Sequence, residues 1–130
     1  MAITYTVDRD EKLITEIWTG DVHAADLRAH WTTYLKDPEV LSIRRTLVDV
    51  RLAVLHISAY ELSVLVGDIV LPALFDKRWK WKTAIVVSDV AQFEVSRKYQ
   101  AMANLYSKDA IFDTVEQART WLFGRESLQS

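Results

Sequence analysis

The chain has 130 residues, of which half are hydrophobic, a formal net charge of −2 and no cysteine. This length suits one domain with its own core, and the charge supplies no positive field, so we expect no nucleic-acid partner. The lack of cysteine excludes disulfides, thiolate catalysis and sulfur-ligated metal sites. The first residues show neither a basic start nor an apolar signal core, and we expect a cytoplasmic protein.

The first elements predicted are a β-hairpin and a helix. Residues 3–7 alternate apolar and polar side chains, as in a strand with one wet face, and residues 13–19 return as a second strand ending at Gly20. A helix follows from about Ala24 and ends before Pro38. Its apolar side is predicted to comprise Leu27, Trp31, Tyr34 and Leu35.

The centre of the chain, residues 44–75, predicts a buried strand and a long helix. The apolar run at 46–50 is typical of a strand covered on both faces. Ser58 precedes Glu61 by three residues, which predicts a capping box and a helix that begins at Ser58. At about 100° per residue, the core face of this helix is predicted to comprise Leu62, Leu65, Val66, Ile69 and Ala73.

The opposite side of the same helix is also apolar. It carries Tyr60, Val64, Leu71, Leu74 and Phe75. A helix that is apolar on nearly every side is normally covered on every side. We therefore expect helix 58–75 to contact a hydrophobic partner, either a second copy of the chain in a homodimer or a small apolar ligand.

The rest of the chain continues the alternation of strands and helices. Residues 82–88 and 110–112 are predicted strands, and Asp89 and Thr114 begin helices. The pattern predicts one α/β domain over residues 1–124, with about five strands and four helices. Its mixed sheet is opened by the N-terminal hairpin and continued by largely parallel strands, and residues 125–130 are predicted to fray.

A segment of cations and tryptophans follows the apolar helix. It comprises Lys77, Arg78, Trp79, Lys80, Trp81 and Lys82. Indole rings beside cations suit the headgroup region of an anionic membrane. Peripheral association with the inner face of the membrane, through this segment and helix 58–75, is therefore the alternative function. In a further interpretation, the tryptophans cover the sheet edge and the lysines point to water.

Several motifs together resemble the STAS-like fold of the sporulation anti-sigma-factor antagonists, and the chain looks most similar to the bacterial SpoIIAA-like group, also called STAS/SEC14-domain proteins. They are YTVD in the hairpin, the glycine closing the second strand, LVDVR, KTAIVVSD and IFDTVEQARTWL, and they extend over residues 3–123. The resemblance implies a STAS-like mixed sheet. None of these motifs is catalytic.

Ser58 is the candidate modification site. In the antagonists a partner kinase phosphorylates a serine at the start of this helix, and Ser58 matches it by position. The resemblance departs at Ile57 and Tyr60, where the antagonists carry aspartate and glycine. Ser58 is accordingly interpreted as a structural cap, with phosphorylation as the alternative.

No catalytic, metal or cofactor site is predicted. Three glycines cannot build a phosphate-binding loop or a dinucleotide fingerprint, and no third ligand joins His23 and His30. Asp49, Arg51 and Asp89 fall at strand ends, where they are either a ligand-binding cluster or ordinary caps. We therefore predict a non-enzymatic binding or regulatory module without a cofactor.

Overall fold

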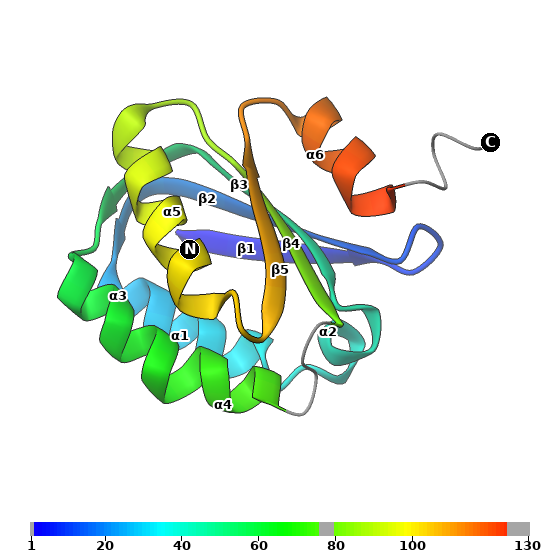
Figure 1. Ribbon diagram of the computed structural model, residues 1–130, viewed down its shortest axis with the longest axis horizontal. Helices are drawn as coiled ribbons and strands as arrows, with labels where there is room; N and C mark the ends of the chain where they lie inside the picture. Colours follow the sequence, from blue (N-terminus) through cyan, green and yellow to red (C-terminus); the bar gives the residue numbers. More distant parts are fainter. Residues whose placement is uncertain (1, 76–79, 125–130) are drawn as a thin grey trace.

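The computed structural model describes residues 2–75 and 80–124, and its helices cover both faces of one sheet (Figure 1). The strands are β1 (Ile3–Asp8), β2 (Leu13–His23), β3 (Arg45–His56), β4 (Trp81–Val86) and β5 (Ser107–Phe112). They lie in chain order; β1 and β2 pair antiparallel, and the later pairs are parallel. The predicted α/β fold with a mixed sheet is confirmed. The predicted tail, 125–130, lies outside the described residues.

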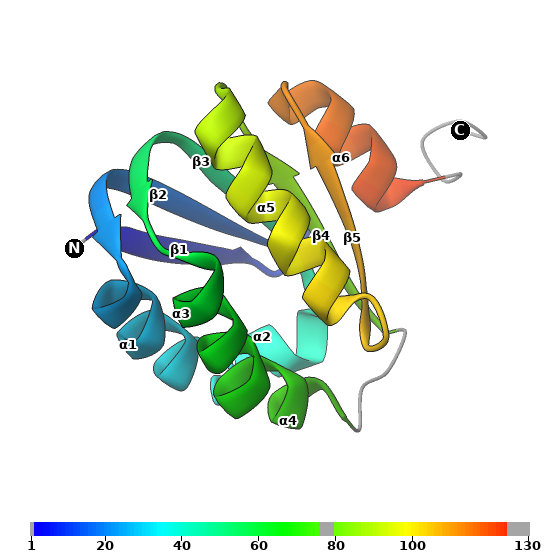
Figure 2. The same ribbon diagram turned by 60° about the vertical axis from the view of Figure 1, so that its left-hand side comes forward.

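Most helices form one layer on one face of the sheet. Right-handed crossovers between parallel strands that follow in chain order place their helices on the same side, and Figure 2 shows α1, α3, α4 and α5 grouped in this way. The helices are α1 (Ala24–Tyr34), α2 (Pro38–Ile43), α3 (Ala59–Leu65), the π-helix η1 (Val66–Val70), α4 (Leu71–Leu74), α5 (Val90–Ala103) and α6 (Val115–Phe123). The larger core cluster lies between this layer and the sheet.

The other face of the sheet is covered by α6, which packs on β3, β4 and β5 (Figure 1). A smaller core forms there from Leu13, Leu47, Ala84, Val86, Ala118 and Leu122. Ile17 is in phase with Leu13 along β2 but is 38% exposed, so α6 covers only part of this face. Among residues 2–75 and 80–124, no helix is long and apolar enough to cross a membrane.

The predicted helix starts are confirmed. The Ser58 hydroxyl accepts a hydrogen bond from the Glu61 amide at 3.1 Å, and the Glu61 carboxylate accepts one from the Ser58 amide at 3.0 Å. Asp89 and Thr114 likewise accept hydrogen bonds from amides three residues later. These side chains satisfy amides that the first helical turn leaves without partners.

The apolar helix contains a π-helical turn, η1, that the sequence periodicity did not predict. Such a turn takes in one extra residue and rotates every later side chain around the axis. Val70 and Leu74 are consequently buried, at 2% and 1% exposure, whereas Ile69 and Ala73 are only partly buried. The predicted place of Leu74 on the outer face is therefore wrong.

Several other boundaries differ from the prediction. β4 covers Trp81–Val86 instead of 82–88, and β5 begins at Ser107 instead of residue 110. β2 continues past Gly20, which has a positive φ of 67°, as far as His23. β3 runs to His56 because it stays paired with β2 over this length. A short helix, α2, begins at Pro38, where the sequence predicted only an end; Asp37 caps it, and proline suits the first helical position because it has no amide to satisfy.

Candidate functional site

A cavity of about 70 Å³ lies between the sheet and the helical layer. Close-packed cores contain few voids larger than a water molecule, so a space of this size distinguishes the region. Strand periodicity builds one wall, because alternate side chains of β2 and β3 point toward the helices. The helical wall includes Leu27 of α1, Leu62 of α3, Val70 of η1, Leu74 of α4 and Val95 of α5.

A buried carboxylate forms part of the strand wall. Glu16 is in phase with Ile14 and Trp18 along β2, so its side chain enters the core, where it is only 3% exposed. Its Oε1 atom accepts a hydrogen bond from the Trp18 indole nitrogen at 3.0 Å and lies 3.0 Å from Nε2 of His30. Glu16 is thus a hydrogen-bonded carboxylate at the cavity, anchored from both the sheet and α1.

Two tyrosine hydroxyls lie in the same region as Glu16 and His30. The hydroxyl of Tyr34 lies 2.7 Å from that of Thr46, and both residues line the cavity. Burial, together with the negative charge of Glu16, raises the pKa of Tyr34 well above its ordinary value. Tyr5 donates a hydrogen bond to Asp37 at 2.6 Å, and burial together with that bond raises its pKa to about 12. Both phenols are therefore neutral at physiological pH.

A second carboxylate lies beside the cavity. Asp109 on β5 accepts a hydrogen bond from the Ser107 hydroxyl at 2.7 Å, and its Oδ1 atom is buried without a hydrogen-bond partner among the described residues. Burial raises the pKa of Asp109 to about 6, although hydrogen bonds from Ser107 and Thr83 oppose the rise. Asp109 also raises the pKa of Tyr99, after the larger effect of burial. The cavity therefore has carboxylates near two of its sides.

Five aromatic side chains surround the same space: Trp18, Trp31, Tyr34, Trp81 and Tyr99. Four of these rings form two pairs, with centroids 5.7 Å apart for Trp31 and Tyr99 and 6.5 Å apart for Tyr34 and Trp81. Aromatic pairs at such distances stabilise one another beyond simple burial. The cavity thus has a largely aromatic lining on these sides.

The residues predicted to form the outer contact surface have different surroundings. Tyr60 and Phe75 are exposed, at 76% and 58%, whereas Val64 and Leu71 are half-buried. Leu74 instead lines the cavity. The structure therefore divides the predicted set between an exposed face and the interior.

The predicted Lys/Trp segment is likewise divided. Residues 77–79 lie outside the described residues, and Lys80 is exposed. Trp81 is 4% exposed and lines the cavity, because β4 begins there and turns the indole inward. The Lys82 ammonium donates to the carbonyl of Trp121 at 2.8 Å and lies over the indole of that residue. The burial of Trp81 contradicts its predicted contact with a membrane, and the contact of the other residues of the segment stays a prediction.

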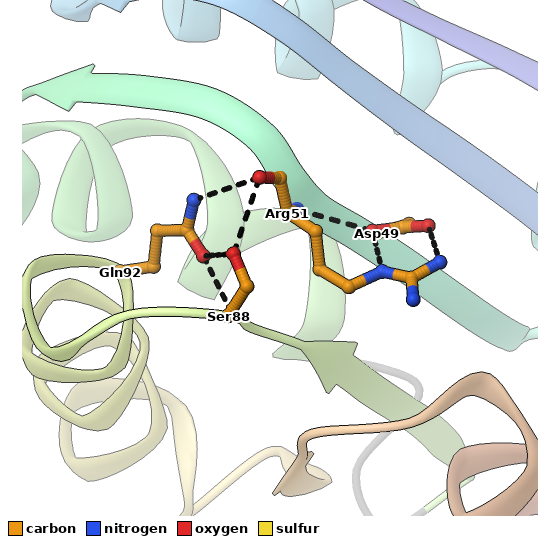
Figure 3. A network of polar contacts seen from close by, with 4 residues as sticks. All are labelled: Asp49, Arg51, Ser88 and Gln92. Atoms are coloured by element: carbon orange, nitrogen blue, oxygen red, sulfur yellow. Dashed lines mark hydrogen bonds and ion pairs between the residues drawn. The ribbon is translucent and has the colours of Figure 1, made fainter.

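Of the residues predicted at strand ends, Asp49 and Arg51 lie inside β3, because this strand continues to His56, and they contact each other (Figure 3). Arg51 binds Asp49 through two side-chain hydrogen bonds, at 2.8 and 3.0 Å. Burial raises the pKa of Asp49, but the hydrogen bonds and charge of Arg51 outweigh it, so the pKa lies below its ordinary value. Asp89 caps α5. The cluster thus contains a mutually satisfied ion pair and a helix cap.

Gln92 links the later part of β3 to the segment that follows β4. In this region β3 extends beyond its pairing with β4. Its side-chain amide donates to the carbonyl of Arg51 at 3.3 Å, and its oxygen accepts from the Ser88 amide at 2.7 Å (Figure 3). The same amide donates to the carbonyl of Ala53 at 2.9 Å. These bonds satisfy backbone groups that a neighbouring strand would otherwise satisfy. Gln92 is therefore a structural link between β3 and α5.

Sequence reasoning missed most of the cavity. A usable signal was present in β2, where a charged residue, Glu16, occupies a core position between Ile14 and Trp18. The same signal is present in β5, where Asp109 is in phase with Ile111. A carboxylate at a core position needs a partner, and that need points to a polar site inside the domain.

Comparison with known proteins identifies the fold. No family model and no curated protein matches the chain. A crystal structure of an uncharacterised protein of the DUF3478 family from Shewanella loihica PV-4, described as having a SpoIIAA-like fold, is similar with a TM-score of 0.60. The match covers 93% of this chain and 94% of that chain at 15% identity. The SpoIIAA-like fold predicted from the motifs is thus confirmed, and the shared feature at this identity is the fold.

Proposed function

We propose that this protein is a non-enzymatic binding module that takes a small, mainly apolar ligand into the cavity between β2–β4 and the helical layer. The observation that carries the proposal is the cavity itself, which combines an apolar lining with a few convergent polar groups. Ligand sites in proteins typically have this composition. The inner side of helix 58–75 supplies Leu62, Val70 and Leu74, so the apolar helix contacts the ligand with its inner face.

Two hydroxyl groups of the cavity, those of Thr46 and Ser96, support binding over nucleophilic catalysis, whereas the hydroxyl of Thr83 interacts with the Asp109 carboxylate. Thr46 is hydrogen-bonded to Tyr34, and Ser96 donates to the backbone carbonyl of Gln92 at 2.8 Å. A hydroxyl nucleophile needs a base within hydrogen-bonding reach. The one imidazole next to the cavity among the described residues, His30, is instead bonded to Glu16.

Xenon tests the proposal, because it enters small apolar cavities without a specific chemical contact. Methyl NMR spectra recorded under xenon pressure should show shifts for Leu62, Val70 and Leu74, and smaller shifts for the exposed Leu52 and Val54. If the methyl groups of the cavity do not respond, the space is closed to apolar ligands and the proposal fails.

A cavity-filling variant sharpens the test. Val95→Phe adds a ring to the lining of the cavity and should remove the xenon shifts. Val90→Phe makes the same change on the same helix at a position that is 75% exposed, and it should leave the shifts unchanged. The melting temperature of each variant shows whether the fold is retained, since overpacking costs about 1–3 kcal/mol.

Contact of the outer helix face with a second copy of the chain stays a prediction. Tyr60 and Phe75 support it by their exposure, and they lie roughly 22 Å apart along the helical axis at 1.5 Å per residue. Sedimentation velocity of the double variant Tyr60→Ser, Phe75→Ser tests it. A dimer of the wild-type chain that the variant loses would support this interface, and a monomeric wild-type chain would exclude it.

A further inference from the structure

The aromatic lining and the carboxylates of the cavity together favour positively charged ligands. The faces of indole and phenol rings carry negative electrostatic potential and attract cations, most strongly where water is excluded. Five such side chains line the cavity. Glu16, the carboxylate in its lining, is 3% exposed, so a positive group beside it would be weakly screened.

Among the described residues beside the cavity, His30, which contacts Glu16, is the one that becomes positive when protonated. None of the described residues in its lining is lysine or arginine. Asp109 lies next to Thr83, which belongs to the lining, and both Asp109 and Glu16 add to the effect of burial in raising the pKa of Tyr99. The field of these residues therefore disfavours an anion and favours a cation.

Three side chains surround the carboxylate of Glu16. Trp18 and His30 both contact Oε1, and a side-chain hydrogen bond with Glu16 contributes to the raised pKa of Tyr34. His30 approaches from α1, in contact with the rings of Tyr5 and Tyr34. A cation inside the cavity would meet the carboxylate from the side of the aromatic lining.

We infer that the cavity binds a small organic cation, an alkylated ammonium group held between the aromatic rings and Glu16. This inference rests on the proposed binding function and adds the class of ligand. The volume of about 70 Å³ limits the ligand to a small head group at this position. A metal ion is disfavoured, since the described residues contain no group of three or more metal-ligating side chains.

Two probes of the same shape isolate the effect of charge. Choline carries a trimethylammonium group, and 3,3-dimethylbutan-1-ol carries a neutral tert-butyl group in its place. Titrations followed by amide NMR should show choline binding at least tenfold more tightly than the alcohol, with the largest shifts at residues of the cavity wall. Equal binding, or tighter binding of the alcohol, would overturn the inference.

Variants test the role of the carboxylate. Glu16→Gln keeps the shape and removes the charge, so it should weaken choline binding at least tenfold and change binding of the alcohol less than twofold. Glu94→Gln makes the same change at an exposed position of α5 and should affect neither probe. If Glu16→Gln leaves the preference for choline intact, Glu16 is not the cation partner and the inference fails.

The outcomes separate the two levels of the proposal. If xenon shifts the cavity methyl groups but choline is not preferred over the alcohol, the proposed binding function stands and the cation inference is refuted. If neither xenon shifts nor a preference for choline is observed, the binding function and the cation inference are both refuted. If Glu16→Gln does not fold, Tyr99→Leu, which removes one ring and keeps both carboxylates, should weaken choline binding more than binding of the alcohol. An equal loss for the two probes would count against the cation.

Discussion

The side chains of Glu16 and His30 meet at 3.0 Å inside the domain, with only 4% and 6% of their respective surfaces exposed. Glu16 comes from β2 and His30 from α1, so the contact fixes the first helix against the sheet. Removing one partner of a buried polar pair leaves the other without compensation, whereas replacing both by apolar groups is much less costly.

This contact gives the first prediction. Glu16→Leu should lower the free energy of unfolding by about 3 kcal/mol, because Trp18 and His30 both lose an acceptor. The double variant Glu16→Leu, His30→Leu should recover part of this loss. Urea denaturation at neutral pH measures both values, and Glu94→Leu on the surface of α5 provides the control. A double variant less stable than the single one would contradict this account of the pair.

The second prediction concerns pH. Burial raises the pKa of Asp109 from 3.8 to about 6, so the folded state holds the proton more tightly than the unfolded state. The stability that this carboxyl group contributes is fully present below about pH 4 and is lost as the pH rises through about 6. Asp109→Asn should therefore match the wild-type stability near pH 4 and exceed it by about 2 kcal/mol at pH 7.5.

Chemical denaturation at several pH values tests the Asp109 prediction. Asp10→Asn, at an exposed position in the hairpin turn, is the matched control and should show no such pH-dependent gain. A constant difference between Asp109→Asn and wild type across this pH range would show that the carboxyl group does not titrate differently on folding.

The third prediction concerns the helix cap at Ser58. Ser58→Ala removes the acceptor of the Glu61 amide and should cost about 1 kcal/mol of stability. Ser63→Ala, an exposed position in the same helix, should cost little, because its hydroxyl bonds only the carbonyl of Tyr60. Thermal unfolding compares the two variants. Equal stability of Ser58→Ala and wild type would leave the cap without an energetic role.

The fourth prediction concerns Gln92. Gln92→Ala leaves the carbonyl of Ala53 and the amide of Ser88 without this partner and should destabilise the fold by about 2 kcal/mol. Gln117 occupies the same third position of α6 but is exposed, so Gln117→Ala should change stability by less than about 0.5 kcal/mol. Hydrogen exchange in Gln92→Ala should increase first at the end of β3. Unchanged exchange there would refute the structural link.

Much of the fold was predictable because local patterns and tertiary contacts agree. The alternation in β1 and the cap at Ser58 are set by neighbouring residues. The extension of β3 to His56 depends on pairing with β2, which no local pattern contains. The short helix α2 was missed because Pro38 ends one helix and also begins the next.

The site was less predictable than the fold. Helix periodicity identified the apolar helix but assigned Leu74 to the wrong side, because a regular α-helical wheel does not include a π turn. The cavity depends on side chains from β2, α1, β4 and α5 that meet only in the folded chain. Glu16 has an ordinary strand setting in the sequence, and only its phase along β2 indicates burial.

The extra residue of η1 also bears on how the apolar helix tolerates a change in length. Deleting one residue at this turn, for example Gly67, would restore α-helical spacing and keep Val70 and Leu74 on the same side as Leu62 and Leu65. Strand order and the remaining helices would be unaffected by this change. A single codon deletion at this turn is thus expected to preserve the inner wall of the domain, whereas a deletion between Val70 and Leu74 would turn Leu74 away from it.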